Sequence, residues 1–252
     1  MGNQNSLIFK IILILSLVLN ISFGIYSIST MDCNSKKIRG DIAEKDKIAN
    51  ENQSQNPFTT ISYNTKMDIF MAIPNDTNEI IFLGNSLTEH FPVTELMHDA
   101  HIRNRGISGE GIAQVINRLE EVTEGKPKKI FIEIGINDIL NDQHADSIKK
   151  KYSQLISKIR EQSQLTVIYL QSLLPTSFAV NGKTGAAMEN IRLINAYLEQ
   201  ISDNKQVKYI NLFDAFYDGK GLSPKYDSGD HLHLNGAGYL LWTDLIKAYV
   251  RE

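Results

Sequence analysis

Five residues that lie far apart in the sequence have the chemical groups that acyl transfer requires. This chemistry needs a nucleophile, a base that takes its proton, a group that orients the base, and donors for the oxyanion. Ser86 is a candidate nucleophile, and His233 is a candidate base that Asp230, three residues earlier, could orient. The Asn137 side-chain amide and the Gly106 backbone N–H are candidate oxyanion donors. The set predicts a serine hydrolase site, provided that the fold brings the five residues together.

Each of these residues has a more ordinary interpretation when it is taken alone. A serine after a strand is more often a helix cap, an asparagine a turn former, and a glycine part of a tight turn. Asp230 and His233 could be a structural hydrogen-bonded pair in a glycine-rich loop. Two further histidines lie nearby in the sequence. We expect His231, which is too close to Asp230 for the same arrangement, to be exposed. His90, one helical turn after Ser86, could reach the cleft, but we expect it to lie at the surface.

The elements that must position these residues begin near Tyr63. From there, apolar runs suited to buried strands alternate with segments of helical period. The expected strands span residues 79–83, 102–104, 129–134, 165–171 and 207–212. Apolar stripes predict helices around residues 112–119, 148–159 and 188–201, and a last helix that starts near Asn235. The pattern predicts an α/β protein of three layers, with a flavodoxin-like central sheet of five parallel strands.

The polar segments follow the expected strands, as a ligand site in an open parallel sheet requires. "GNSLTE" comes after the first strand, "NRGISGEG" after the second and "IGINDIL" after the third, and "DSGDHLHLNGAGY" follows the fifth after a longer loop. A flavodoxin-like strand order of 2-1-3-4-5 would place the first strand between the second and the third. Ser86 would then lie between the loops that carry Gly106 and Asn137.

These four segments resemble the sequence blocks of the SGNH, or GDSL-type, hydrolases. "FLGNSLTE" is similar to the nucleophile block, "NRGISGEG" to the glycine block, "GIND" to the GxND block and "DHLHLNGAGY" to the DxxH block. The resemblance runs from about Tyr63 to the C-terminus, and the wider pattern is most similar to the platelet-activating-factor acetylhydrolase-like branch. It implies hydrolysis of small acyl esters, with Ser86 N–H, Gly106 N–H and the Asn137 side chain as the oxyanion hole. Asn85 stands where the name-giving motif has Asp, a departure that the family tolerates.

Composition limits the partners and cofactors of the protein. Of its 252 residues 42% are hydrophobic, which is ordinary for a globular protein, and the net charge of −3 gives no electrostatic signature of nucleic-acid binding. The single cysteine, Cys33, excludes an intrachain disulfide, and the six histidines show no HExxH spacing. We therefore expect no metal, no other cofactor and no nucleic-acid partner.

The N-terminal segment differs in character from the rest of the chain. Lys10 precedes a run of mostly Ile, Leu and Val that ends at Ile28, so residues 1–30 are predicted to be a signal peptide or an uncleaved membrane anchor. Residues 31–60 are rich in Asn, Gln, Ser and Lys and are expected to be a polar linker, and residues 61–252 the catalytic domain. This order predicts an exported domain in the periplasm or cell envelope, with a membrane tether left open.

Three functions are compatible with the sequence. The first is hydrolysis of a short acyl ester, with acetyl as the expected acyl group, on a carbohydrate or lipid. The second is O-acyl transfer to a cell-surface glycan by the same residues, and the third is glycan binding on an inactive hydrolase fold. The intact Ser86, Asn137, Asp230 and His233 favour catalysis over binding alone. The segment "LLPTSFAVNGKTGAA" is expected to form the pocket walls.

Overall fold

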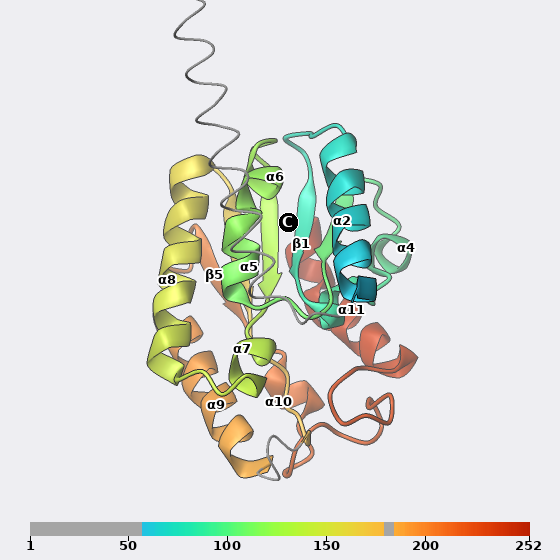
Figure 1. Cartoon of the computed structure of the whole chain (residues 1–252), viewed down its shortest axis with the longest axis vertical. Helices are drawn as coiled ribbons and strands as arrows, with labels where there is room; N and C mark the ends of the chain where they lie inside the picture. The colour runs from blue at the N-terminus through green and yellow to red at the C-terminus, as the bar shows by residue number, and fades with distance from the viewer. Residues whose placement is uncertain (1–56, 179–183) are drawn as a thin grey trace, which may run out of the picture. The chain divides into compact units, whose positions relative to one another are not determined.

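A computed structural model of the chain describes residues 57–178 and 184–252. Ile61–Glu252 form one compact unit built on a parallel sheet (Figure 1). The predicted export signal or anchor, residues 31–56 of the expected linker, and residues 179–183 of the expected pocket wall lie outside the described residues. Within the described ranges, no helix has the length and apolar character needed to cross a bilayer.

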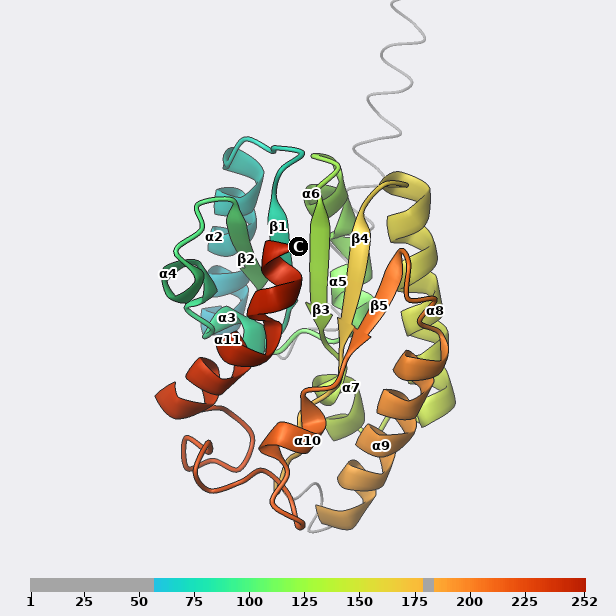
Figure 2. The ribbon, with the colours of Figure 1, turned by 180° about the vertical axis from the view of Figure 1, so that it is seen from behind.

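The sheet has the predicted topology. Its strands are β1 (Ile80–Gly84), β2 (Ile102–Gly106), β3 (Lys129–Glu133), β4 (Val167–Gln171) and β5 (Val207–Ile210). They are all parallel and lie in the order β2-β1-β3-β4-β5 (Figure 2). Gly84 is in register with Gly106 on one side and Glu133 on the other, so three neighbouring strands end level with one another. The α/β class and the flavodoxin-like strand order are therefore confirmed.

Helices cover both faces of the sheet. They are α2 (Pro57–Ala72), α3 (Ser86–Glu89), α4 (Val93–Met97), α5 (Ile112–Asn117), α6 (Leu119–Thr123), α7 (Ile136–Leu140), α8 (Ala145–Gln162), α9 (Thr184–Gln200), α10 (Phe213–Phe216) and α11 (Gly236–Arg251). Helices α5, α6 and α8 cover the face seen in Figure 1, and α11 crosses the opposite face, seen in Figure 2. The short helices α3 and α7 begin directly after β1 and β3, so each presents its first turn at the carboxyl edge of the sheet.

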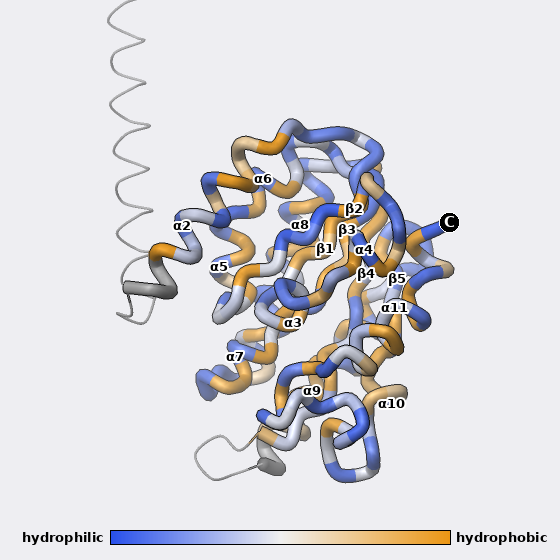
Figure 3. The backbone as a smooth tube through the Cα atoms, turned by 90° about the vertical axis from the view of Figure 1, so that its right-hand side faces the viewer, coloured by the Kyte–Doolittle hydropathy of each residue, from blue (hydrophilic) through white to orange (hydrophobic). Residues whose placement is uncertain are grey.

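The core fixes this edge firmly. All five residues of β1 and of β3 are buried, and β1 is coloured mainly hydrophobic in Figure 3. The rings of Phe82, Phe131 and Tyr169 stack across three neighbouring strands, with centroids 4.8 and 4.4 Å apart. Phe91, which follows α3, stacks on the fully buried Trp242 of α11 at 4.9 Å. The segment that carries Ser86 is thus packed between the sheet and the last helix.

Three local features differ from the sequence-based expectation. The single helix expected over residues 112–119 is divided into α5 and α6 at Arg118, whose backbone leaves the helical conformation while its side chain enters buried ion pairs. The fourth strand starts at Val167 because Leu165 is 94% exposed and lies in the preceding turn. Helix α2 was not expected, since Ile61, Ile69 and Met71 are exposed and the helix has no apolar stripe for the pattern to reveal.

Candidate active site

Ser86 is the first residue of α3, directly beyond the end of β1. The preceding Asn85 is the helix cap, and its side-chain Oδ1 accepts a hydrogen bond from the N–H of Leu87 at 3.0 Å. Because Asn85 takes over the capping role, the hydroxyl of Ser86 is left for other partners. Ser86 is only partly buried, so its side chain can meet both solvent and a substrate.

The loop before α11 brings His233 and Asp230 to this serine. Nε2 of His233 lies 2.8 Å from Oγ of Ser86, and Nδ1 of the same ring lies 2.5 Å from Oδ2 of Asp230. The other oxygen of Asp230 accepts the backbone N–H groups of Leu232 and His233, at 3.0 and 2.8 Å. The three side chains therefore form one continuous hydrogen-bonded chain, in the arrangement of a serine hydrolase triad.

The charges of Asp230 and His233 suit proton transfer from Ser86. Burial acts to raise the pKa of Asp230, but the His233 ring and the two backbone N–H groups outweigh it and hold that pKa well below its ordinary value. Asp230 is accordingly an anion at neutral pH. A neutral imidazole that donates Nδ1–H to this carboxylate leaves Nε2 free to accept the proton of Ser86.

The two other histidines occupy different positions. The ring of His231 pairs with Asp227, with Nδ1 and Oδ2 2.8 Å apart, and its side chain is 63% exposed, as expected. His90 is also exposed, but its ring centroid lies only 5.7 Å from that of His233. His90 is therefore at the rim of the site, beside the candidate base, rather than at an unrelated part of the surface.

Asn137 lies in the first turn of α7, directly beyond β3. Its Nδ2 donates to the carbonyl of Glu110 at 2.8 Å, which occupies one of its two N–H groups and leaves the other available. The neighbouring Asp138 accepts the N–H of Ile112 at 2.9 Å. The turn after β3 is thus tied to the glycine loop, by which we mean residues 107–111 between β2 and α5.

Gly106 ends β2 in register with Gly84, and its N–H is already engaged. It donates to Oδ1 of Asn104 at 2.9 Å, whereas the sequence led us to expect a free donor. A side chain on Gly106 would place its Cβ 2.3 Å from the backbone nitrogen of Glu89, so the glycine is needed for the close approach of β2 and α3. The structure gives Gly106 a packing role that the sequence pattern did not indicate.

Gly109, at the tip of the glycine loop, is a residue that the sequence reasoning missed. It has a φ of 84°, which favours glycine, and no atom lies within 4 Å of the position that a Cβ would take. Its N–H and that of Ser86 have no hydrogen-bond partner among the described residues. The next residue, Glu110, holds the Asn137 amide through its carbonyl. The N–H of Gly109 is thus available as a donor while that of Gly106 is not, and the second glycine of "GISG" was the available signal.

Glu133 is a second residue that no sequence pattern pointed to. It ends β3 in register with Gly84, and its carboxyl oxygens are buried with no hydrogen-bond partner among the described residues. Burial raises the pKa of Glu133 to about 8, so the group is mostly protonated at neutral pH. A buried neutral carboxyl group therefore stands at the end of β3, the strand next to the one that leads to Ser86.

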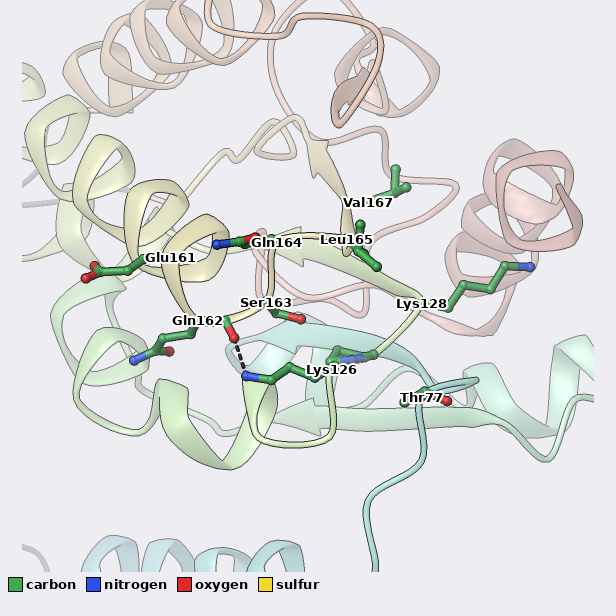
Figure 4. A pocket seen from close by; sticks show the side chains of 10 residues that line it. Thr77, Lys126, Lys128, Glu161, Gln162, Ser163, Gln164, Leu165 and Val167 are labelled. Atoms are coloured by element: carbon green, nitrogen blue, oxygen red, sulfur yellow. Dashed lines mark hydrogen bonds between the residues drawn. The ribbon is translucent and has the colours of Figure 1, made fainter.

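A separate cavity of about 640 Å³ lies at the other end of the sheet (Figure 4). Its lining includes Thr77, Lys128 and Val167, which stand at or just before the amino ends of β1, β3 and β4. It is consequently remote from the carboxyl edge and from Ser86. Within residues 57–178 and 184–252, no group of three His, Cys, Asp or Glu side chains is arranged to hold a metal ion.

The model of the GDSL-like Lipase/Acylhydrolase family matches residues 82–241, more than half of the chain. Subunit alpha1 of human platelet-activating factor acetylhydrolase IB is 24% identical over 177 residues, which are 68% of this chain and 74% of that protein. A structure from Streptococcus pneumonia, described as a platelet activating factor, is 25% identical with a TM-score of 0.67, covering 77% of this chain and 94% of that one.

A third similarity is to Axe2, an acetylxylan esterase from Geobacillus stearothermophilus, whose structure was determined as a catalytic mutant. It is 17% identical with a TM-score of 0.56 and covers 70% of this chain and 95% of that one. At this level of identity the likeness concerns the fold.

Proposed function

Because the chain belongs to the GDSL-like lipase/acylhydrolase family and is thus a carboxylic ester hydrolase, we propose that it removes short acyl groups, acetyl first among them, from a carbohydrate or lipid. The proposed catalytic residues are Ser86, His233 and Asp230. The observation that carries the proposal is their unbroken hydrogen-bonded chain, with links of 2.8 and 2.5 Å, at the carboxyl edge of the sheet.

The reaction proceeds in two halves. In the first, His233 takes the proton of Ser86 as Oγ attacks the ester carbonyl carbon, and the protonated imidazole then gives that proton to the departing alcohol. This leaves an acyl group on Ser86. In the second half, His233 activates a water that attacks the acyl carbon and releases the acid, returning the proton to Ser86. Asp230 remains an anion throughout and stabilises the imidazolium ion.

The oxyanion of each tetrahedral intermediate needs donors near Ser86. We assign the Ser86 N–H and the free N–H of the Asn137 amide, because both lie in the first turns beyond β1 and β3. For the third donor, Gly106 was expected, but it would have to break its bond to Asn104 to take part. Gly109 has no such bond to break and is our preferred third donor.

Two similarities support a short acyl group. The human relative is named as an acetylhydrolase of platelet-activating factor, and Axe2 is named as an acetylxylan esterase. The first name points to a lipid and the second to a carbohydrate, while acetyl is common to both. We therefore propose the acetyl group and retain both classes of alcohol.

A substrate panel tests this function. The purified protein is given aryl esters of rising acyl length and, in parallel, acetylated sugars and acetylated lipids, with Ser86→Ala as the control. We expect the acetyl ester to be cleaved fastest and all turnover to vanish in the control. Hydrolysis that rises with chain length would contradict the acetyl assignment, and no hydrolysis of any ester would contradict the function. Acyl transfer to an added sugar in preference to water would identify an acyltransferase instead.

We also propose that the catalytic unit works outside the cytoplasm. The support is the order of parts in the sequence, in which Lys10, an apolar run and a polar segment precede the hydrolase. The test is protease treatment of intact spheroplasts from cells that express the full chain. Digestion of the hydrolase unit before lysis is expected, and protection until lysis would show that it faces the cytoplasm.

A further inference from the structure

The free N–H of Asn137 can point at an oxyanion only if the whole amide is held in one orientation. The bond that holds it is donated by its other N–H to the carbonyl of Glu110, at 2.8 Å. This carbonyl belongs to the glycine loop, so the position of the donor depends on the conformation of that loop. Loops are in general the most mobile part of a fold. A fixed orientation of the Asn137 amide therefore requires a contact that restrains the glycine loop.

The side chain of Glu110 supplies that restraint. It turns away from the site into the protein, where only 3% of it is exposed. Both of its carboxylate oxygens accept from Nε of Arg118, at 2.9 and 3.0 Å, and Oε2 also accepts from Nη2 at 2.6 Å. A planar guanidinium group that grips a carboxylate in this way fixes its direction as well as its position.

Arg118 is itself held from three sides. Only 1% of its side chain is exposed, Nη2 donates to the carbonyl of Arg105 at 2.7 Å, and Nη1 pairs with Glu121 at 2.7 Å. Glu121 also pairs with Arg105, whose guanidinium lies 4.5 Å from the ring centre of Phe70. The glycine loop is thereby anchored to β2, to α6 and to Arg118, the residue between α5 and α6.

Stability alone does not account for so many buried charges. Taking an ion pair out of water costs about as much as the attraction returns, and apolar residues of equal volume often serve a core as well. A network of this kind does fix the relative positions of its members. Here Arg118 binds the carboxylate of Glu110, and the carbonyl of Glu110 binds the amide of Asn137.

We propose that the buried Glu110–Arg118 pair is a positioning element of the oxyanion hole, which holds the Asn137 amide in its reactive orientation through the Glu110 carbonyl. The inference rests on the proposed esterase function, and it assigns to Glu110 and Arg118 a part in the rate of the chemical step rather than in substrate binding. Neither side chain touches the substrate.

The experiment measures kcat and KM for an aryl acetate with Glu110→Gln and with Arg118→Lys, which keeps the charge but loses the planar fork. We expect kcat to fall about ten- to a hundred-fold, as a small misplacement of a catalytic group does, with KM nearly unchanged. Glu79→Gln is the matched control, because Glu79 is equally buried and paired with Arg103 at 2.9 Å but has no hydrogen bond to the glycine loop. Its kcat should stay within about twofold of the wild type, as expected of a residue remote from the site.

The decisive comparison repeats Glu110→Gln and Arg118→Lys in an Asn137→Ala background. If the pair acts through Asn137, each change should cost almost nothing further in kcat once the amide is gone. A full, additive loss in that background, or an equal loss in Glu79→Gln, would overturn the proposal. An inactive wild-type protein would instead refute the esterase function, so the two failures are distinguishable. Thermal unfolding checks that each variant is folded, and Arg118→Lys decides the matter should Glu110→Gln not fold.

Discussion

Nε2 of His233 lies 2.8 Å from Oγ of Ser86, although 147 residues separate the two in the sequence. The contact exists because both residues lie over the same part of the sheet. Ser86 follows β1, which lies between β2 and β3, and His233 comes from the loop that leads into α11, the helix packed over these strands. Tyr239 of α11 fastens the two parts further, since its hydroxyl donates to the carbonyl of Leu87 at 3.0 Å. A base is thus placed against a nucleophile by the packing of one helix.

Removal of the nucleophile should abolish hydrolysis without unfolding the protein. We expect Ser86→Ala to show no turnover of an aryl acetate and a melting temperature close to that of the wild type, because the helix cap belongs to Asn85 and not to Ser86. Steady-state kinetics and calorimetry measure the two quantities. Unchanged turnover by a folded Ser86→Ala variant would refute the assignment of Ser86.

The two histidines of the loop before α11 should behave differently. His233→Ala is expected to lose nearly all activity, because no other ring nitrogen is within hydrogen-bond distance of Ser86 among the described residues. His231→Ala should keep most of it, since that ring is exposed and paired with Asp227. The same assay on both variants makes the comparison, and the reverse result would mean that His231 is the base.

Loss of the Asn137 amide should slow the chemical step selectively. We predict that Asn137→Ala lowers kcat by roughly a hundred- to a thousand-fold, the usual loss for one oxyanion donor, while KM changes far less. Its tie to the glycine loop is lost as well, so a melting curve accompanies the kinetics. An effect on KM alone would make Asn137 a substrate-binding residue.

Glu133 should make the stability of the protein depend on pH. In the folded state the carboxyl group keeps its proton up to about pH 8, whereas the unfolded chain releases it near the ordinary value of 4.5. Because the pKa of Glu133 is higher in the folded state, its proton contributes to the free energy of unfolding. This contribution is fully present below pH 4.5 and is lost as the pH rises from 4.5 to about 8. The free energy of unfolding is therefore expected to fall by roughly 1 kcal/mol for each pH unit in that window.

Glu133→Gln removes the titrating group and should therefore flatten the decline. Urea unfolding at several pH values between 4.5 and 8 gives the free energy of unfolding for both proteins. We expect the advantage of Glu133→Gln over the wild type to grow steadily with pH. Glu120→Gln, at an exposed position, is the control. Parallel curves for the wild type and Glu133→Gln would show that Glu133 does not titrate in this window.

The placement of the site could be predicted from sequence because it depends on regular features. Buried strands and amphipathic helices that alternate give a parallel sheet, and the carboxyl ends of such strands meet at one edge. The expected proximity of Ser86, Asn137 and the Asp230–His233 loop follows from that rule taken together with a strand order. The strand order was an added assumption, and it proved right.

The features that could not be predicted depend on side-chain direction and loop conformation. The N–H of Gly106 is occupied because it donates to the side chain of Asn104, and no residue spacing in the sequence reveals this hydrogen bond. The contact between Glu110 and Arg118 could not be predicted from their separation of eight residues. Helix α5 begins between them, so neither the helical nor the strand period relates their side chains. The burial of Glu133 follows from its strand, but its lack of a partner depends on every neighbour in three dimensions.

The proposed mechanism requires that Ser86 becomes acylated, and mass spectrometry of the protein detects this group. After rapid acid quench during turnover of an aryl acetate, or after treatment with a fluorophosphonate, peptide mapping should find the added group on Ser86. Ser86→Ala should carry no label. A label on another residue, or continued hydrolysis by a protein that never becomes labelled at Ser86, would show that Ser86 is not the nucleophile.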